Sequence, residues 1–158
     1  MLNTIASFTV DHRSITPGIY ISRIDGDITT YDLRTRRPNC GSFMDQITMH
    51  TFEHLFATYI RNSNLGDRVI YFGPMGCATG FYLLIRNADH KETLEAVRCV
   101  LRQMIAHKGP VFGCSERECG NYKTLRLESA VGEAEEYLKV LDAPREISFQ
   151  YPAGEGEE

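Results

Sequence analysis

The chain has 158 residues, of which 42% are hydrophobic and 24% are charged, and its formal net charge is −4. These values are typical of one globular domain with a sizeable core, and they argue against nucleic-acid binding, which needs a basic face. No apolar run approaches the roughly 20 residues of a membrane-spanning helix, and the N-terminus lacks the regions of a secretory signal. We therefore expect a cytoplasmic protein with no nucleic-acid or membrane partner.

The N-terminal part of the chain predicts an antiparallel β unit. Residues 7–10 have the composition of a short strand, and residues 18–24 and 27–34 are rich in β-forming side chains. The pair Asp25-Gly26 between the two longer runs is a strong hairpin signal.

The first long helix is predicted over about residues 46–62. Its apolar side chains recur four residues apart, Leu55 with Tyr59 and Phe56 with Ile60, which is the spacing of one helix face.

The remaining elements alternate between strands and helices. We expect strands over residues 67–72 and 80–86, helices over 91–107 and 128–141, and a loop with at most a short strand over 111–127. The Gly-Pro pair after residue 72 is expected to end the first of these strands in a loop.

This order of elements predicts an α+β fold. We expect a mostly antiparallel sheet with its helices packed largely on one face. Residues 1–150 should form a single domain, and residues 151–158, which contain three glycine or alanine residues and three glutamates, should form a disordered acidic tail.

The helix over residues 46–62 carries three polar side chains on one face. His50, Glu53 and His54 are three and four residues apart, so they point into the same space. Two imidazoles and a carboxylate suit a divalent metal with a general base beside it. The alternative is a buried polar face whose histidines are satisfied by hydrogen bonds. We favour the metal, because burying three polar groups together is costly unless they are paired.

A metal with two histidine ligands needs at least one more protein ligand. The candidates are Cys114 and Cys119, which lie in one glycine-bearing segment. If both bind, the site is a closed structural Cys2His2 site, and if one binds, the site keeps an open position for catalysis. The spacing permits either arrangement.

The other three cysteines differ in their expected roles. The count of five is odd and no export signal precedes them, so disulfides are not expected. Cys77 follows a Gly-Pro loop, where its sulfur could reach the edge of a cleft, or it could be a small buried hydrophobe. Cys99 lies between Val97 and Leu101 on a predicted helix, where only a packing role is expected, and Cys40 receives no role.

Several motifs resemble one family, the S-ribosylhomocysteine lyases of the LuxS type. His50-Thr51-Phe52-Glu53-His54-Leu55 resembles the family signature His-Thr-Leu-Glu-His-Leu, and the run Pro-Met-Gly-Cys-Ala-Thr-Gly-Phe-Tyr at 74–82 resembles its Pro-Met-Gly-Cys loop. Further pieces in register are Ser7-Phe8, Asp11-His12, Tyr31-Asp32-Leu33-Arg34, Pro38-Asn39 and Cys119-Gly120. Together they cover nearly the whole chain.

The resemblance implies a role for each site residue. The metal ligands would be His50, His54 and Cys119, holding one Fe(II) per subunit, with zinc or cobalt able to substitute. The general acid/base pair would be Glu53 and Cys77. The substrate-binding residues would be Ser7, His12 and Arg34. The resemblance also implies a LuxS-like homodimer with active sites at the subunit interface.

The implied activity is cleavage of S-ribosylhomocysteine. The sugar carbonyl would shift from C1 to C3 by internal redox isomerisation, and β-elimination would then release homocysteine and 4,5-dihydroxy-2,3-pentanedione. This product is the precursor of autoinducer-2 in quorum sensing, and the reaction clears an intermediate of the methyl cycle. The chain departs from the family pattern at Gly73 and Tyr71, where the family commonly has Ser and Asp.

Two other functions are compatible with parts of the sequence. The pattern His-x-x-Glu-His also marks a class of metallopeptidases, although this similarity is confined to one helix. A non-enzymatic binding module with a structural Cys2His2 zinc site would leave Glu53 and Cys77 without a role.

Overall fold

The expected hairpin forms the first two strands of the sheet. In the computed structural model, which describes residues 1–154, β1 (Gly18–Asp25) pairs antiparallel with β2 (Ile28–Arg34). Gly26 in the turn has a φ of 59°, a left-handed conformation that glycine adopts without a Cβ clash.

The sheet is completed by β3 (Val69–Pro74) and β4 (Gly80–Arg86). Its strand order is β1-β2-β4-β3, and every neighbouring pair is antiparallel, which confirms the predicted sheet type. β3 begins later than expected because residues 66–68 form a short 3-10 helix, and it continues through Gly73 and Pro74. Proline is tolerated there because β3 is an edge strand.

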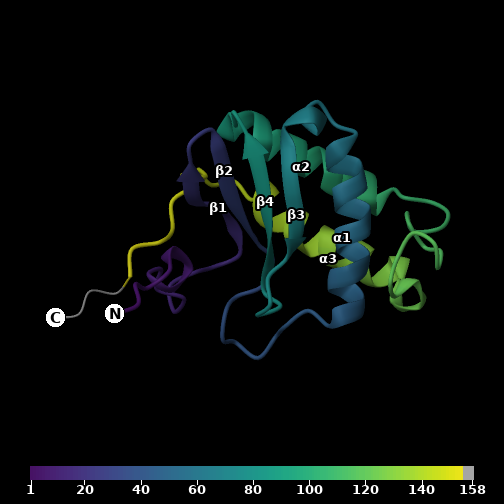
Figure 1. Cartoon of the computed structure of the whole chain (residues 1–158), viewed down its shortest axis with the longest axis horizontal. Coiled ribbons are helices and arrows are strands. Elements are labelled where there is room, and N and C mark those ends of the chain that lie inside the picture. The colour runs from purple at the N-terminus through teal and green to yellow at the C-terminus, as the bar shows by residue number, and fades with distance from the viewer. Residues whose placement is uncertain (155–158) are drawn as a thin grey trace.

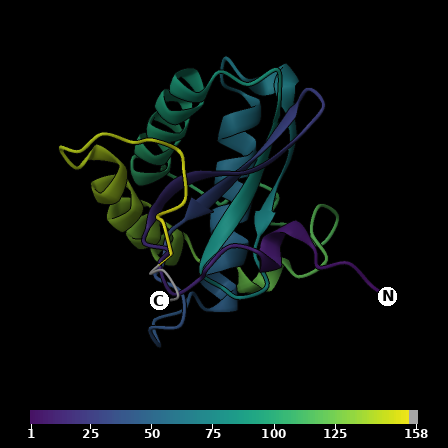
Figure 2. The same ribbon diagram turned by 90° about the vertical axis from the view of Figure 1, so that its left-hand side faces the viewer.

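Three helices cover one face of this sheet, as Figures 1 and 2 show. They are α1 (Gln46–Arg61), α2 (His90–Ile105) and α3 (Leu127–Asp142). The predicted α+β fold with its helices on one face is thereby confirmed. Among the described residues, no helix combines the length and apolar character needed to cross a membrane.

Phenylalanine rings join α1 to the sheet. Phe52 stacks on Phe81 of β4 with ring centroids 4.5 Å apart, and Phe56 stacks on Phe72 of β3 at 4.2 Å. All four rings are buried. Because this face of α1 faces the core, the opposite face, with His50 and His54, is turned away from the sheet.

The sheet has a second face that the helices leave uncovered, which we call the open face. Along β4, Phe81 and Leu83 are buried on the helix side, while Tyr82 and Leu84 alternate with them and are only half-buried. The strand expected over residues 7–10 is wrong. Residues 6–8 form a 3-10 helix, and Ser7 in it lies beside Tyr82 and Leu84 of the open face.

The loop between α2 and α3 connects the helices without a strand in the part of the chain that the structure describes. It contains only a 3-10 helix at residues 122–124, so the short strand considered there is absent. This loop packs beside α1 on the right of Figure 1.

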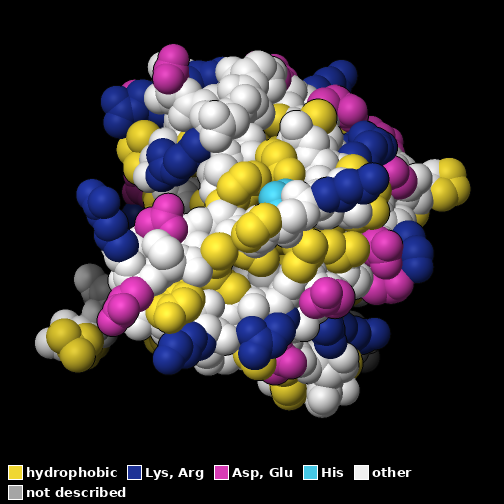
Figure 3. All heavy atoms as spheres, turned by 90° about the vertical axis from the view of Figure 1, so that its right-hand side faces the viewer, with side chains coloured by type: hydrophobic (Ala, Val, Ile, Leu, Met, Phe, Trp, Pro, Cys, Tyr) yellow, Lys and Arg dark blue, Asp and Glu magenta, His cyan; other side chains and the backbone are white. Residues whose placement is uncertain are grey.

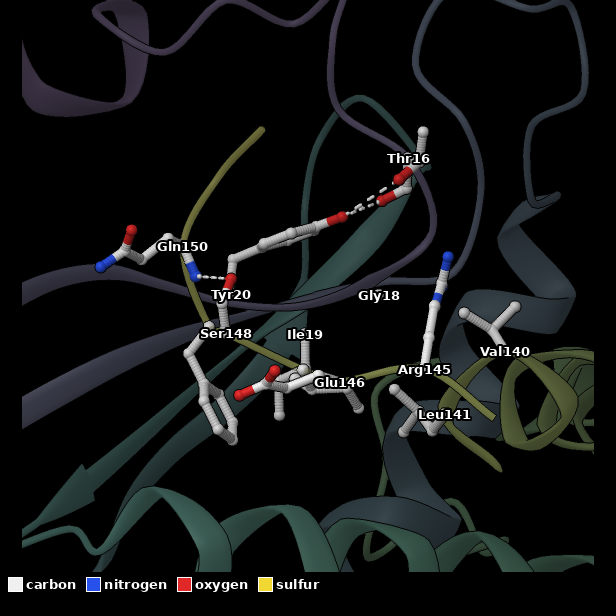
Figure 4. A pocket seen from close by; sticks show the side chains of 12 residues that line it. Thr16, Gly18, Ile19, Tyr20, Val140, Leu141, Arg145, Glu146, Ser148 and Gln150 are labelled. Atoms are coloured by element: carbon white, nitrogen blue, oxygen red, sulfur yellow. Dashed lines mark hydrogen bonds between the residues drawn. The ribbon is translucent and has the colours of Figure 1, made fainter. Parts of the chain in front are cut away.

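The segment after α3, residues 143–154, passes along the edge strand β1, and we call it the C-terminal strap (Figure 2). The N–H of Ile21 in β1 donates to the carbonyl of Phe149 at 2.8 Å. Figure 4 shows the cavity of about 160 Å³ that lies between the strap, β1 and the end of α3. The acidic tail was expected to begin at residue 151, but Tyr151 is held by a stack on Tyr20 and a hydrogen bond to Asp32, so this residue is ordered. Residues 155–158 of that expected tail lie outside the described residues.

Candidate active site

His50, His54 and Cys119 form a cluster of potential metal ligands. One ligand atom of each residue lies within 4.8 Å of the others. Both histidines lie on the outward face of α1, and Cys119 is supplied by the loop between α2 and α3. Cys119 is 65 positions or more from the two histidines in the sequence, so only the helical part of the cluster follows from local spacing.

Hydrogen bonds orient both imidazoles. Nδ1 of His54 lies 2.8 Å from the carbonyl oxygen of Phe112, which can only accept, so this nitrogen carries the proton. Nδ1 of His50 lies 2.8 Å from Oγ1 of Thr124. That hydroxyl donates to the carbonyl of Asn121 at 3.0 Å and is therefore an acceptor for His50. Both Nε2 atoms are left with a lone pair for a metal.

The donor set fits a divalent metal ion. Nε2 of His50 lies 3.3 Å from Sγ of Cys119, and the N–H of Asn121 donates to the same sulfur at 3.4 Å. Donor atoms in a tetrahedral site with metal–nitrogen and metal–sulfur bonds of about 2.1 and 2.3 Å are about 3.5 Å apart. Three protein donors leave a fourth position for substrate.

Cys114 is not part of this cluster. Among the described residues, the group of donors that could hold a metal comprises His50, His54 and Cys119. Gly113, next to Cys114, lies directly against the His54 ring with a φ of 65°. The closed Cys2His2 site considered from the sequence is therefore not the arrangement observed.

Burial changes the acidity of the groups around the cluster. Burial lowers the pKa of His50, and the nearby His54 lowers it further, which favours the neutral imidazole that a metal requires. Burial raises the pKa of Glu53, while His54 acts in the opposite direction. A carboxyl group that retains its proton to higher pH is suited to general acid/base catalysis near neutrality.

The surface on this side of the molecule is mixed in character. Figure 3 views the side of α1 and of the loop between α2 and α3, where hydrophobic side chains surround an exposed imidazole edge and charges of both signs lie around them. A small molecule that has both apolar and polar groups would meet hydrophobic and charged side chains here.

Cys77 lies in a second group of polar residues, at the end of β3. Its thiol is exposed, so it is not the buried hydrophobe considered from the sequence. Sγ of Cys77 lies 3.0 Å from Oγ1 of Thr79 and 4.0 Å from Nη1 of Arg34, and the same Nη1 donates to Thr79 at 2.7 Å. Ala78 between them has a φ of 60°, in a tight turn that presents the thiol.

Arg34 is held by a buried carboxylate that the sequence argument had not singled out. Asp32 is fully buried and accepts from Arg34 at 3.1 Å and 2.6 Å through its two oxygens. Burial alone would lower the pKa of Arg34, but the hydrogen bonds and charge of Asp32 outweigh it and raise the pKa. Asp32 and Thr79 belong to this group although only Arg34 and Cys77 were expected from the resemblance. In the sequence, Asp32 lies two positions from Arg34 and Thr79 lies two positions from Cys77. This proximity was the signal that could have identified them.

The substrate-binding residues expected near the N-terminus are placed separately. Ser7 lines an open-face cavity of about 420 Å³ together with Tyr71, Tyr82 and Leu84. Tyr82 also lies near Asp32 and Cys77, whose charges raise its pKa after burial, so this cavity adjoins the Cys77 group. The Nδ1 of His12 lies 2.8 Å from the carbonyl oxygen of Val10.

The two departures from the family pattern are physically linked. The Tyr71 hydroxyl lies over Gly73, in the space that a Cβ at position 73 would occupy. A serine at 73 would collide with the ring in this orientation, so Gly73 makes room for Tyr71 at the cavity that Ser7 lines.

Within one chain the two polar groups face different directions. The His50, His54 and Cys119 cluster lies on the outer side of α1, while Cys77 and Arg34 lie at the open face of the sheet. The phenylalanine layer of α1 and the sheet separates them.

Comparison with known proteins gives a consistent result. The sequence model of one family, described as S-Ribosylhomocysteinase (LuxS), matches residues 5–146. The chain is 38% identical to an S-ribosylhomocysteine lyase of Borreliella afzelii over 157 residues, covering 96% of this chain and 100% of the relative. It is 40% identical to relatives of the same name from Clostridium beijerinckii, over 96% and 99% of the two chains, and Desulfotalea psychrophila, over 96% and 100%.

Proposed function

This chain belongs to the S-ribosylhomocysteinase (LuxS) family and is a carbon–sulfur lyase, and from that membership we propose how its residues divide the reaction. The substrate is S-ribosylhomocysteine, and the products are homocysteine and 4,5-dihydroxy-2,3-pentanedione. The observation that carries this proposal is the open cluster of His50, His54 and Cys119, with the partly buried Glu53 on the same helix face. A metallopeptidase or a closed structural zinc site would not account for the Cys77 group.

We propose that the cluster holds one Fe(II) per subunit. Two imidazoles and one thiolate form a donor set of intermediate softness, which also suits zinc and cobalt. When bound, the metal supplies Lewis acidity that makes a C–H next to a sugar carbonyl acidic. His50, His54 and Cys119 hold it, and the hydrogen bonds to Thr124 and Phe112 keep the two imidazoles in the required tautomer.

Cys77 and Glu53 move the protons. In each isomerisation step one of them, in its basic form, takes a proton from the carbon next to the carbonyl, and a proton is returned to the former carbonyl carbon. Two such steps place the carbonyl at C3 without any external oxidant or reductant, because the carbon oxidised and the carbon reduced are in the same sugar. Removal of the C4 proton then expels the thioether sulfur from C5, which leaves as the homocysteine thiol after gaining a proton.

Arg34, Ser7 and His12 bind and orient the substrate in this proposal. The Arg34 guanidinium stabilises the Cys77 thiolate across the 4.0 Å contact, and Thr79 offers a hydroxyl to the same sulfur at 3.0 Å. Ser7 lies at the adjoining cavity and contacts the homocysteine portion of the substrate.

We also propose that the active enzyme is a homodimer whose sites are shared. The metal cluster and the Cys77 group lie on different sides of one chain, and a single sugar must contact both. A second copy seated on the open face, where Tyr71, Leu84 and Ile5 provide apolar surface, would bring one set from each chain together. Because Cys77 and Cys119 must stay as thiolates, the reducing cytoplasm is the proposed location. There the product would supply autoinducer-2 for quorum sensing.

The decisive experiment measures thiol release. Purified protein loaded with Fe(II) or Co(II) should release homocysteine from S-ribosylhomocysteine, detected with a thiol reagent. Cys77→Ala should lose at least about 10²-fold in turnover, the usual contribution of a general acid/base, while its metal content is unchanged.

One matched variant and one further assay separate this function from its rivals. Cys114→Ala should keep both metal and activity, and loss of metal in this variant would support the closed zinc site instead. Cleavage of peptides by the holoenzyme would support a metallopeptidase. If the metal-loaded wild-type protein releases no thiol, the lyase proposal is wrong.

A further inference from the structure

The C-terminal strap wraps around the edge of the sheet. On the helix side, the Phe149 ring lies 5.5 Å from the ring of His90 and 6.5 Å from that of Tyr31. Two residues later, on the open face, Tyr151 stacks on Tyr20 at 4.9 Å. Phe149 has a φ of 61°, which is rare for a bulky residue and persists only where the surroundings impose it. The contacts on both faces therefore fix the strap where it turns around β1.

The strap ends this turn with a hydrogen bond to a buried charge. The Tyr151 hydroxyl donates to Oδ2 of Asp32 at 2.7 Å, across 119 positions of sequence. Burial and the neighbouring Asp32 carboxylate raise the pKa of Tyr151, so the phenol keeps its proton and stays a donor at every physiological pH. This contact brings the strap directly onto the carboxylate that holds Arg34.

The two carboxylate oxygens of Asp32 accept hydrogen bonds from both the strap and Arg34. Oδ2 accepts from both the Tyr151 hydroxyl and Nη2 of Arg34, the latter at 2.6 Å, while Oδ1 accepts from Nε of Arg34. The remaining Nη1 of Arg34 is directed to Thr79 and Cys77. Because guanidinium is planar and rigid, fixing its Nε and Nη2 edge also fixes where Nη1 points.

We propose that Tyr151 is a positioning residue for catalysis, acting through Asp32 and Arg34 on the Cys77 thiolate. This inference rests on the proposed function, in which Cys77 exchanges protons with the substrate. The Tyr151 hydroxyl bond draws charge away from Asp32 and anchors it, so that Arg34 keeps its place and more of its positive charge for the sulfur. Without the hydroxyl, Asp32 neutralises Arg34 more fully and the thiolate is less well stabilised.

Two other phenols face these charges and do not duplicate this role. Tyr82 of β4 lies near Asp32, Arg34 and Cys77, and its raised pKa keeps it neutral. Tyr137 of α3 is fully buried near Asp32, and its hydroxyl donates to the carbonyl of Gly18 at 2.8 Å.

The test compares Tyr151→Phe with Tyr20→Phe in the metal-loaded enzyme. Tyr151→Phe removes the hydroxyl from Asp32 and leaves the stacked ring. The control removes a hydroxyl from the other ring of the same stack, which Figure 4 shows pointing to Thr16, where it donates to the carbonyl at 2.7 Å. The measurement is the rate of alkylation of Cys77 by iodoacetamide from pH 5 to 10, followed by mass spectrometry of the peptide that contains Cys77.

Alkylation of Cys77 at pH 7 should be about threefold to tenfold slower in Tyr151→Phe, with the profile moved to higher pH, because a hydrogen bond to a charged group changes its interactions by an energy of this order. The kcat for thiol release should fall by a similar factor, and Tyr20→Phe should match the wild type in both. Profiles of Tyr151→Phe and wild type that superimpose would overturn the inference, whatever the lyase assay shows. Failure of the wild type to release thiol would instead overturn the proposed function, since alkylation requires no substrate.

Discussion

Two hydrogen bonds decide which nitrogen of each histidine faces the cluster on α1. The Phe112 carbonyl and the Thr124 hydroxyl both accept from Nδ1, so both Nε2 atoms point their lone pairs toward Cys119. A histidine whose other tautomer were favoured would present a proton there and would bind no metal. The loop between α2 and α3 thus supplies one ligand and also the groups that prepare the other two.

The partial burial of the Glu53 carboxylate lowers the stability of the folded protein. Burial raises its pKa above that of an unfolded chain, so its ionised form is disfavoured in the folded state. The folded protein then binds more protons than the unfolded chain, and stability falls as the pH rises from the unfolded pKa, about 4.3, through the folded pKa. At neutral pH the enzyme is less stable than it would be with a neutral side chain at this position.

Glu53→Gln should therefore separate activity from stability. Turnover should fall by about 10²-fold or more, because the variant cannot exchange a proton at this position. In thermal unfolding without metal, the variant should melt at a higher temperature than the wild type at pH 8, and the gain should vanish at about pH 3, below the unfolded pKa, where Glu53 is protonated in both states. Equal melting temperatures at pH 8 would show that the carboxylate bears no burial cost.

At the scale of elements, α1 joins the site to the core. Phe52 lies between two residues of the polar face in sequence, but its ring is 1% exposed and stacks on Phe56, Phe72 and Phe81. The position of the polar face therefore depends on how this ring packs.

Phe52→Ala should destabilise the protein by about 3–5 kcal/mol, since it leaves a cavity among three aromatic rings, whereas Phe52→Leu should cost about 1.5 kcal/mol or less if the core repacks. Urea unfolding of the three proteins measures both values. Phe43→Ala is the control, because this ring is 48% exposed and its loss should change stability little. A small loss in Phe52→Ala would mean that the stack does not anchor α1.

Local sequence patterns predicted most helices and strands. The features that these patterns did not predict depend on contacts between residues far apart in the sequence. The spacing of Leu55, Tyr59 and their neighbours predicted α1 to within a residue at its C-terminal end, because amphipathic period is a local property. The strand expected over residues 7–10 failed because those residues pack against the open face as a 3-10 helix. Asp32 was not singled out, since its importance depends on Tyr151, which is 119 positions away.

The ligand choice shows the same limit at the site. Spacing left Cys114 and Cys119 equally possible, and the resemblance to a family favoured Cys119. The fold brings Cys119 to His50 because Cys119 N–H donates to the Ser115 carbonyl at 3.0 Å, in a turn that directs the sulfur toward α1. Such a turn is not visible in the spacing of the cysteines.

At the scale of the whole molecule, one chain carries two incomplete sets of functional groups. The metal cluster lies outside α1, the Cys77 group lies on the open face, and the buried phenylalanine layer lies between them. This separation supports the proposed dimer, in which one subunit would contribute the metal ligands and Glu53 and its partner would contribute Cys77 and Arg34.

Mixing two inactive variants tests this arrangement. In a heterodimer of Cys77→Ala and His54→Ala, one of the two shared sites would receive its metal ligands from the first chain and Cys77 from the second, and would be intact. The other site would carry both defects. Random exchange of subunits makes half of the dimers mixed, and each mixed dimer has one intact site out of two. Thiol release should therefore recover to about one quarter of the wild-type rate.

The control is each variant mixed with itself under the same exchange conditions, which should stay inactive. If the mixed sample is also inactive although native mass spectrometry shows heterodimers, the metal cluster and Cys77 must act within one chain. The separation of the two groups by α1 and the sheet would then have to be closed by a change of conformation, because the contacts that hold Arg34 to Asp32 and His54 to Phe112 keep them apart in this fold.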